Sequence, residues 1–88
     1  MRFTTTRLCG GEALMAISAE ELNLDLDHAA DIFGKEGCEI KEKDDMILVI
    51  VWKGMETTIY PQGKIMFFPL KDKRLCVDHA TEILITLQ

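Results

Sequence analysis

Residues 46–69, MILVIVWKGMETTIYPQGKIMFFP, constrain the fold most, because three strand-like segments and two turns follow one another there. Large apolar and β-branched side chains dominate the segments, and glycine or proline separates them. This alternation of apolar runs and turn residues is typical of strands joined by short turns. The predicted strands are 46–53, 55–60 and 64–68, and the turns lie at Gly54 and at 61–63. Strands connected in this way form an antiparallel sheet.

The segments on either side predict a fourth strand and two helices. Residues 38–43 alternate Cys and Ile with Glu and Lys, as in a half-exposed strand. Asp25 or Asp27 can cap a short helix through 28–33, which Gly34 or Gly37 ends. Apolar residues recur at helical spacing in 75–87, which predicts a carboxy-terminal amphipathic helix packed on the sheet.

The first 19 residues are harder to interpret. Residues 1–8, with three consecutive threonines, suit a short strand or an edge segment. Residues 12–19 contain good helix formers, but the run from Leu14 to Ile17 also fits a buried strand. Together the elements predict an α+β fold, with one antiparallel sheet, helices on one face and a single domain over residues 1–88.

The composition is that of a globular protein with an acidic surface. Hydrophobic residues make up 48% of the 88 residues, charged residues make up 28%, and the formal net charge is -5. A negative surface repels phosphate backbones, which disfavours nucleic acid as a partner. A possible exception is a group of basic residues that are close in sequence: Lys64, Lys71, Lys73 and Arg74.

Cysteine content and hydropathy bear on the compartment. The three cysteines, Cys9, Cys38 and Cys76, are widely spaced and odd in number, which predicts free thiols in a reducing environment. No segment resembles a signal peptide, and the longest apolar run is too short to cross a bilayer. We therefore expect a cytoplasmic protein with no membrane partner.

Residues 13–88 resemble one repeat of the TATA-box-binding protein. The stretch ALMAISAEELNLDLDHAADIF is similar to the family's first strand, leucine-rich segment and helix, and TTIYPQGKIM is similar to its threonine-bearing strand, aromatic residue, Gly-Lys turn and following strand. The resemblance implies that Leu14 to Ile17 is a strand. It also implies that a complete saddle needs two copies, because the family's protein has two repeats in one chain.

The same resemblance bears on DNA binding. Aromatic residues of the family wedge between base pairs; Tyr60 keeps one such position, whereas Asp45 lies near the other. The basic residues that the family carries on its strands are sparse here. Losing a wedge and gaining carboxylates weakens minor-groove binding, so the resemblance supports the fold better than it supports DNA binding.

No motif predicts catalysis or a cofactor. Cys76 and His79 have the i, i+3 spacing of a helical ligand pair, but a second close pair is missing, so we expect a buried Cys76, a surface His79 and no metal. The acidic pairs at 20–21 and 44–45 have no evident cause for a shifted pKa, and Gly10-Gly11 lacks the lysine of a phosphate loop. The protein is therefore expected to be non-enzymatic.

The strongest functional signal is that both faces of one strand are apolar. Leu48, Ile50 and Trp52 alternate with Ile47, Val49 and Val51, and Phe67 and Phe68 point to opposite faces. One helical layer covers one face, so the other needs a partner, a ligand or the amino-terminal segment. The candidate binding residues are Trp52, Tyr60, Lys64, Phe67 and Phe68.

We therefore expect an interaction module that forms a homodimer or binds a protein through the uncovered sheet face or an edge strand. Two alternatives remain. One is a dimeric nucleic-acid-binding half-saddle that uses Tyr60 and the basic group around Lys64. The other is a small-molecule or metal-binding domain centred on Trp52 and Phe67 or on Cys76 and His79.

Overall fold

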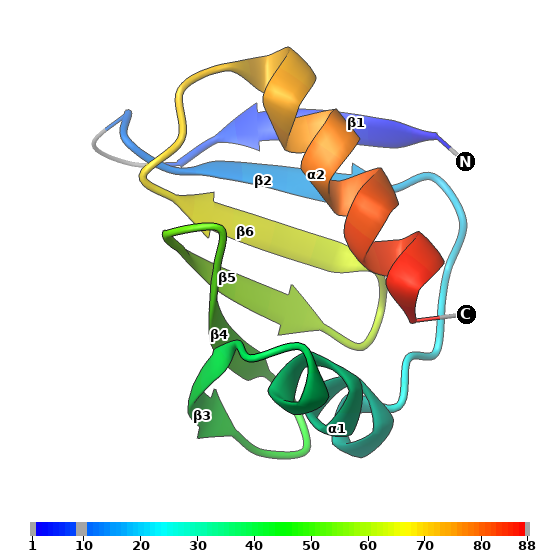
Figure 1. The fold of residues 1–88 in the computed structure, drawn as a ribbon. Coiled ribbons are helices and arrows are strands. Elements are labelled where there is room, and N and C mark those ends of the chain that lie inside the picture. Colours follow the sequence, from blue (N-terminus) through cyan, green and yellow to red (C-terminus); the bar gives the residue numbers. More distant parts are fainter. Residues whose placement is uncertain (1, 9–10, 88) are drawn as a thin grey trace.

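The computed structural model describes residues 2–8 and 11–87, which form one six-stranded antiparallel sheet and two helices (Figure 1). The order of strands across the sheet is β1-β2-β6-β5-β4-β3. The elements in chain order are β1 Phe3–Arg7, β2 Leu14–Ser18, α1 Leu26–Lys35, β3 Glu39–Lys43, β4 Leu48–Trp52, β5 Met55–Tyr60, β6 Lys64–Phe68 and α2 Lys73–Thr86. The expected α+β class with an antiparallel sheet is confirmed.

The four consecutive strands β3 to β6 are those that the sequence predicts, with small changes at their ends. β5 and β6 have the predicted bounds, whereas β4 begins two residues later than expected and ends one residue earlier. The two-residue turn between β4 and β5 places both Lys53 and Gly54 at positive φ, 51° and 79°. Positive φ at both turn positions matches the right-handed twist of the strands that the turn joins.

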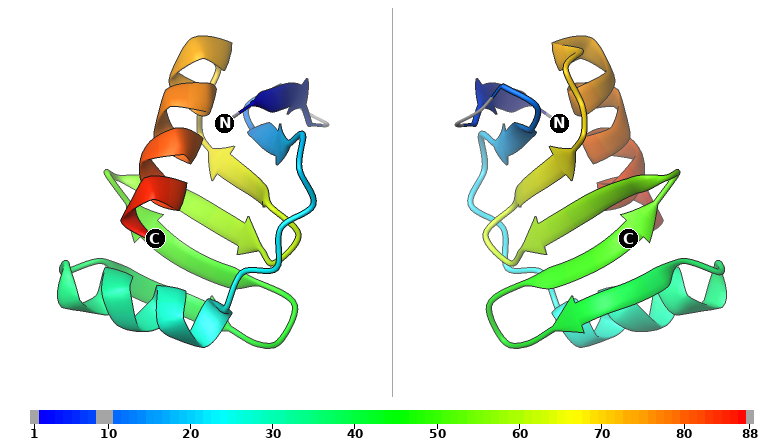
Figure 2. Two further views of the ribbon diagram at one scale, coloured as in Figure 1. Left: turned by 90° about the vertical axis from the view of Figure 1, so that its right-hand side faces the viewer. Right: turned by 90° about the vertical axis from the view of Figure 1, so that its left-hand side faces the viewer.

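The ambiguous segment 12–19 forms a strand, and the amino terminus forms another beside it. β2 lies between β1 and β6, with Leu14 and Ala16 completely buried. Pairing on both sides therefore overrides the helix propensity of its Ala, Leu and Met residues. β1 extends the sheet at its edge, so the alternative in which this segment folds across the uncovered face is wrong (Figure 2).

Both helices are capped by an aspartate at their amino-terminal end, and both lie on the same face of the sheet (Figure 2). The Asp25 carboxylate accepts hydrogen bonds from the backbone N–H groups of Asp27 and His28, so Asp25 is the cap of α1. Asp72 does the same for Arg74 and Leu75 at the start of α2. These bonds satisfy donors that a helix end would otherwise leave unpaired.

The core lies between the sheet and these two helices. Alternate residues of β4 face it, since Leu48, Ile50 and Trp52 are buried while Val49 and Val51 are only half-buried. The other buried hydrophobic residues are Leu14, Ala16, Leu26, Ala29, Phe33, Ile59, Ile65, Phe67, Cys76, Ala80, Ile83 and Leu84. We call this side of the sheet the helix face and the other side the open face.

The connection from β2 to α1 passes beside the β5–β6 turn. Leu22 and Leu24 donate backbone hydrogen bonds to the carbonyl oxygens of Gln62 and Pro61. Gly63 has a φ of +104°, and a Cβ there would lie 3.1 Å from side-chain atoms of Ser18 and Leu22. Glycine therefore allows both the turn and the close approach of the connection. The connection follows the strand ends, which leaves the open face uncovered (Figure 2).

Candidate interaction surface

The open face carries a continuous set of mostly apolar side chains, of which Thr58 is buried, Phe68 is exposed and the others are half-buried. Strand alternation places it opposite the core residues, because neighbouring residues of a strand point to opposite faces. Its members are Met15, Ile17, Val49, Val51, Thr58, Tyr60, Met66 and Phe68. No helix or strand within residues 2–8 and 11–87 covers these side chains (Figure 2).

Strand register aligns the middle of this set into one row. Met15 of β2 pairs with Met66 of β6, Met66 pairs with Thr58 of β5, and Thr58 pairs with Val49 of β4. Directly opposed residues of antiparallel strands share a face and lie about 5 Å apart. The row therefore crosses four adjacent strands without a charged side chain.

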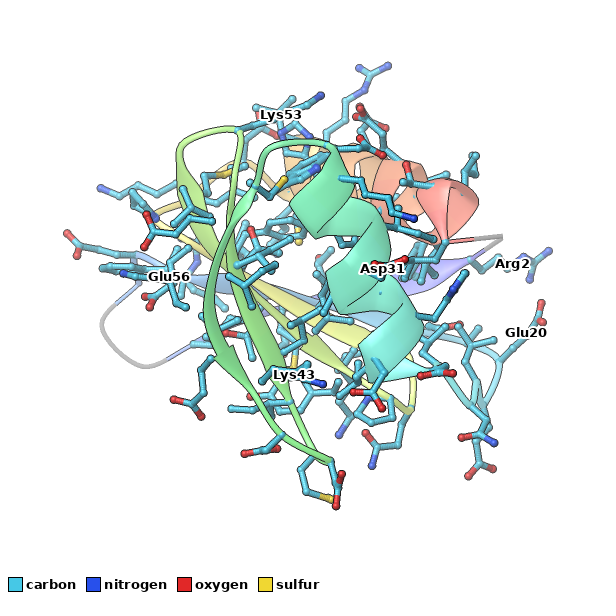
Figure 3. All side chains as sticks on the ribbon, turned by 60° about the horizontal axis from the view of Figure 1, so that its bottom comes forward. Arg2, Glu20, Asp31, Lys43, Lys53 and Glu56 are labelled. Atoms are coloured by element: carbon cyan, nitrogen blue, oxygen red, sulfur yellow. The ribbon has the colours of Figure 1, made fainter. Side chains whose placement is uncertain are left out.

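Charged residues border the row on the open face. The Glu56 carboxylate lies 3.9 Å from the Lys41 amine, and Glu56 projects from the side of the sheet away from α1 (Figure 3). Lys43 instead binds Asp27 of α1, which raises the pKa of the Lys43 amine through the hydrogen bond and the charge of Asp27. An apolar centre with a charged rim is the usual composition of a protein–protein interface.

Trp52 and Phe67, two of the expected binding residues, lie in the core instead. Trp52 is 7% exposed and Phe67 is completely buried. Their ring centroids are 6.2 Å apart, and the His79 ring lies 5.1 Å from Trp52 and 5.9 Å from Phe67. This aromatic cluster attaches α2 to the sheet, so it does not line a binding site.

Tyr60, Lys64 and Phe68 belong to the open face but do not converge. Tyr60 pairs with Lys64 beside the β5–β6 turn. Phe68 is at the other end of β6 and is 40% exposed. The five-residue strand separates the two ends by about 13 Å. Tyr60, Lys64 and Phe68 are therefore spread along the open face.

The surface also includes three residues that were not among the expected binding residues: Met15, Ile17 and Met66. The first two lie in the segment whose secondary structure was ambiguous, so their face could not be assigned. Met66 lies between Ile65 and Phe67, which are both completely buried. Because neighbouring residues of a strand point to opposite faces, the predicted strand 64–68 could have placed Met66 on the open face. The strand that the family resemblance implies for Leu14 to Ile17 would have placed Met15 and Ile17 on one face and Leu14 and Ala16 on the other.

Cys76 and His79 do not form a reactive or metal-binding pair. Burial raises the pKa of the Cys76 thiol to about 11, which keeps it protonated at neutral pH. His79 is half-buried against Trp52, and its buried Nδ1 atom has no hydrogen-bond partner among the described residues, so the prediction of a surface histidine is wrong. Within the described residues, no group of three or more His, Cys, Asp or Glu side chains could hold a metal ion, and Cys9 lies outside them.

The basic residues that are close in sequence are separated in space. Lys64 begins β6, whereas Lys73 and Arg74 begin α2 after the opposite end of that strand. Lys64 faces the open side of the sheet, and α2 lies on the helix side (Figure 2). These residues therefore do not form the continuous basic surface that phosphate binding requires.

A hollow of about 230 Å³ near the start of α1 is lined by four aspartates, three of which form hydrogen bonds or an ion pair: Asp25, Asp27 and Asp44. Asp25 caps α1, and the Asp27 carboxylate binds Lys43. The Asp44 carboxylate accepts hydrogen bonds from the backbone N–H groups of Met46 and Ile47. The hollow is therefore a junction of caps and turns.

Comparison of the chain with models of protein families, with curated proteins and with solved structures finds no match. Neither helix in the described part of the chain is long and apolar enough to span a membrane. The case for function therefore depends on the geometry of the open face.

Proposed function

We propose that the protein is a non-enzymatic interaction module that associates with a second copy of itself through the open sheet face. The observation that supports this proposal most is a row of residues across four strands, over which no described helix or strand lies: Met15, Met66, Thr58 and Val49. Sheets that pack face to face bury such a surface in a layer about 10 Å thick.

A second copy fits this surface because both partners would then present the same mostly apolar centre. The charges around it have both signs: Glu39 and Glu42 lie opposite Val51 and Val49 on one side, and Lys64 lies beside the β5–β6 turn on another. A surface with separated positive and negative rim charges can be complementary to itself about a two-fold axis. Burial of the centre supplies the affinity, and the rim charges set the orientation.

The element order from Leu14 to Thr86 supports the proposal of a fold like one repeat of the TATA-box-binding protein. β2, α1, the four strands β3 to β6 and α2 follow one another as that resemblance implies. β1 precedes them as an additional edge strand. A second copy is also what the resemblance implies for a chain with one repeat.

The two alternative functions have less support. A nucleic-acid-binding half-saddle would use Tyr60 and Lys64 on the open face, but the other basic residues lie near the start of α2. A small-molecule site around Trp52 and Phe67 would have to open the core, since both side chains are buried. Neither alternative explains the apolar row as directly as self-association does.

Light scattering over a range of protein concentrations tests the proposal. The wild-type chain should have a mass above that of the 10.0 kDa monomer. Met66→Lys places a charge in the centre of the row and should lower the mass, because a buried unpaired charge opposes association. Gln62→Lys is the control, since it adds the same charge at an exposed turn residue and should leave the mass unchanged. A wild-type monomer, or equal masses for both variants, would contradict the proposal.

A further inference from the structure

We infer that a second copy also pairs along the outer edge of β1, so that two sheets join into one continuous sheet. This contact uses the edge of the sheet and is separate from the face in the proposed function. Three features point to it: the backbone groups of β1, the contrast with the edge at β3, and the side chains that an antiparallel pairing would bring together.

Among residues 2–8 and 11–87, no strand pairs with the outer side of β1, so the backbone groups on that side have no strand partner there. Leu8 N–H donates to the Ala13 carbonyl, and Ala19 N–H donates to the Arg2 carbonyl, at 3.0 and 2.9 Å. Backbone direction alternates along a strand, so Thr4 and Thr6 also face β2. Phe3, Thr5 and Arg7 therefore direct their N–H and C=O groups away from the sheet.

The opposite edge, β3, has protection that β1 lacks. β3 carries four charged residues in five positions, and its register shifts between Ile40 and Glu42. Charged side chains and bulges are the usual means by which proteins prevent edge strands from pairing. β1 pairs regularly with β2 from Phe3 to Arg7, and its three central residues are uncharged threonines. The edge available for pairing is therefore the one at β1.

An antiparallel pair centred on Thr5 is complementary to itself. Thr5 would lie opposite its counterpart in the second copy, and each Phe3 would lie opposite an Arg7. Phe3, Thr5 and Arg7 are the outward-directed residues, so each could donate and accept one hydrogen bond across the junction. Both Phe3 and Arg7 share the helix face with Leu14 and Ala16, where a guanidinium can contact an aromatic ring.

α2 adds a side-chain surface next to the same edge. The helix packs on β1 and β2, and its first turns lie over β1 (Figure 1). His79 contacts Trp52 and Glu82 binds Lys53, so that flank of α2 faces β4. At 100° per residue, Val77 and Thr81 occupy the flank toward β1, and both are half-buried. Pairing at the edge would bring two such flanks near each other.

A pair of double variants tests both the pairing and its register. Thr4 would lie opposite Thr6 of the second copy, with both exposed on the open face. Thr4→Lys with Thr6→Lys places like charges opposite each other and should weaken association about tenfold. Thr4→Lys with Thr6→Glu places opposite charges there and should keep wild-type affinity. The two variants differ at one position only, and neither alters the backbone that binds β2.

The second measurement is amide hydrogen exchange followed by NMR, because it reports the protection of each backbone N–H group of β1. The amides of Thr4 and Thr6 should be protected at every protein concentration, since they bind β2. The amides of Phe3, Thr5 and Arg7 should become protected as the concentration rises. Exchange of these three amides at a rate independent of concentration would overturn the inference, as would equal association of the two double variants.

The masses of these variants distinguish the proposed contact at the β1 edge from the proposed contact at the open face. If both contacts form, the wild type is larger than a dimer, Met66→Lys leaves an edge-paired dimer, and adding the two lysines at Thr4 and Thr6 gives a monomer. If only the face associates, Met66→Lys alone gives the monomer and the inference about β1 is wrong. If only the edge pairs, Met66→Lys has no effect on mass and the proposed function is wrong.

Discussion

The helix face and the open face of the sheet are built from alternate residues of the same strands. On β6, Ile65 and Phe67 are completely buried, while their neighbour Met66 remains half-buried and Phe68 is 40% exposed. The side chains on the two sides have similar chemistry, but α1 and α2 cover only one of them (Figure 2). The difference shows that apolar character alone does not identify the core.

The comparison also separates stability from association. Residues of the helix face stabilise the fold of a single chain, because their burial is complete within it. Most residues of the open face are only half-buried within one chain, and under the proposed function a second copy would bury them further. Substitutions on the helix face should therefore lower the free energy of unfolding, whereas substitutions on the open face should mainly change the association of chains.

The largest expected difference is between Phe67→Ala and Phe68→Ala. Phe67→Ala leaves a cavity against Trp52 and His79 and should lower the free energy of unfolding by about 3–5 kcal/mol. Phe68→Ala should lower it by about 1 kcal/mol or less, because the side chain is already partly exposed. Urea denaturation at a concentration where the chain is monomeric measures both. Equal losses would show that the two faces are equivalent in stability.

The Cys76 thiol should make stability fall at high pH. Burial raises its pKa from 9.0 to about 11, so the unfolded chain loses this proton before the folded chain does. Stability from this group is therefore complete below pH 9 and declines as pH rises toward 11, by about 2–3 kcal/mol in total. Denaturation at pH 8 and pH 10.5 measures the decline. Cys76→Ala is the control and should show a smaller dependence; an identical dependence would argue against the assignment.

The cap of α2 should contribute a smaller amount to the helix face. Asp72→Ala removes the acceptor for the N–H groups of Arg74 and Leu75 and should cost about 1 kcal/mol. Asp78 is exposed on the same helix and does not cap it, so Asp78→Ala should lower the free energy of unfolding by less than Asp72→Ala does. Thermal unfolding of the two variants compares them, and a larger loss for Asp78→Ala would contradict the capping role.

The smallest effect should come from the ion pair between Lys53 and Glu82. The Lys53 amine lies 2.9 Å from Glu82 and 4.7 Å from the centroid of the Trp52 ring, but both charged side chains are half-exposed. Glu82→Gln should therefore lower stability by about 0.2–1 kcal/mol, and the difference should shrink in high salt. A loss that persists unchanged in high salt would indicate a role other than charge pairing.

Local patterns predicted the middle of the chain well. The turn residues Gly54 and 61–63 separate the predicted strands, of which β5 and β6 have the predicted bounds, and the opposite orientation of Phe67 and Phe68 follows from strand alternation. The capping role of Asp25 could be narrowed to two candidates in the same way. These features depend on neighbouring residues, which a sequence displays directly.

Features that depend on distant parts of the chain could not be predicted from local patterns, and only the family resemblance implied the strand that begins at Leu14. The strand at Leu14 to Ser18 is determined by pairing with β1 and β6, against the propensities of its own residues. The burial of His79 depends on Trp52 and Phe67, which belong to other elements. The contrast between the β1 and β3 edges requires the order of strands, which local patterns do not contain.

Methionine oxidation followed by mass spectrometry tests the central claim most directly. Met15 and Met66 lie at the centre of the open face, whereas Met46 is 62% exposed in the β3–β4 connection and serves as an internal reference. If a second copy covers the open face, oxidation of Met15 and Met66 should slow relative to Met46 as protein concentration rises. Ratios that stay constant with concentration would contradict burial of the open face by a second copy.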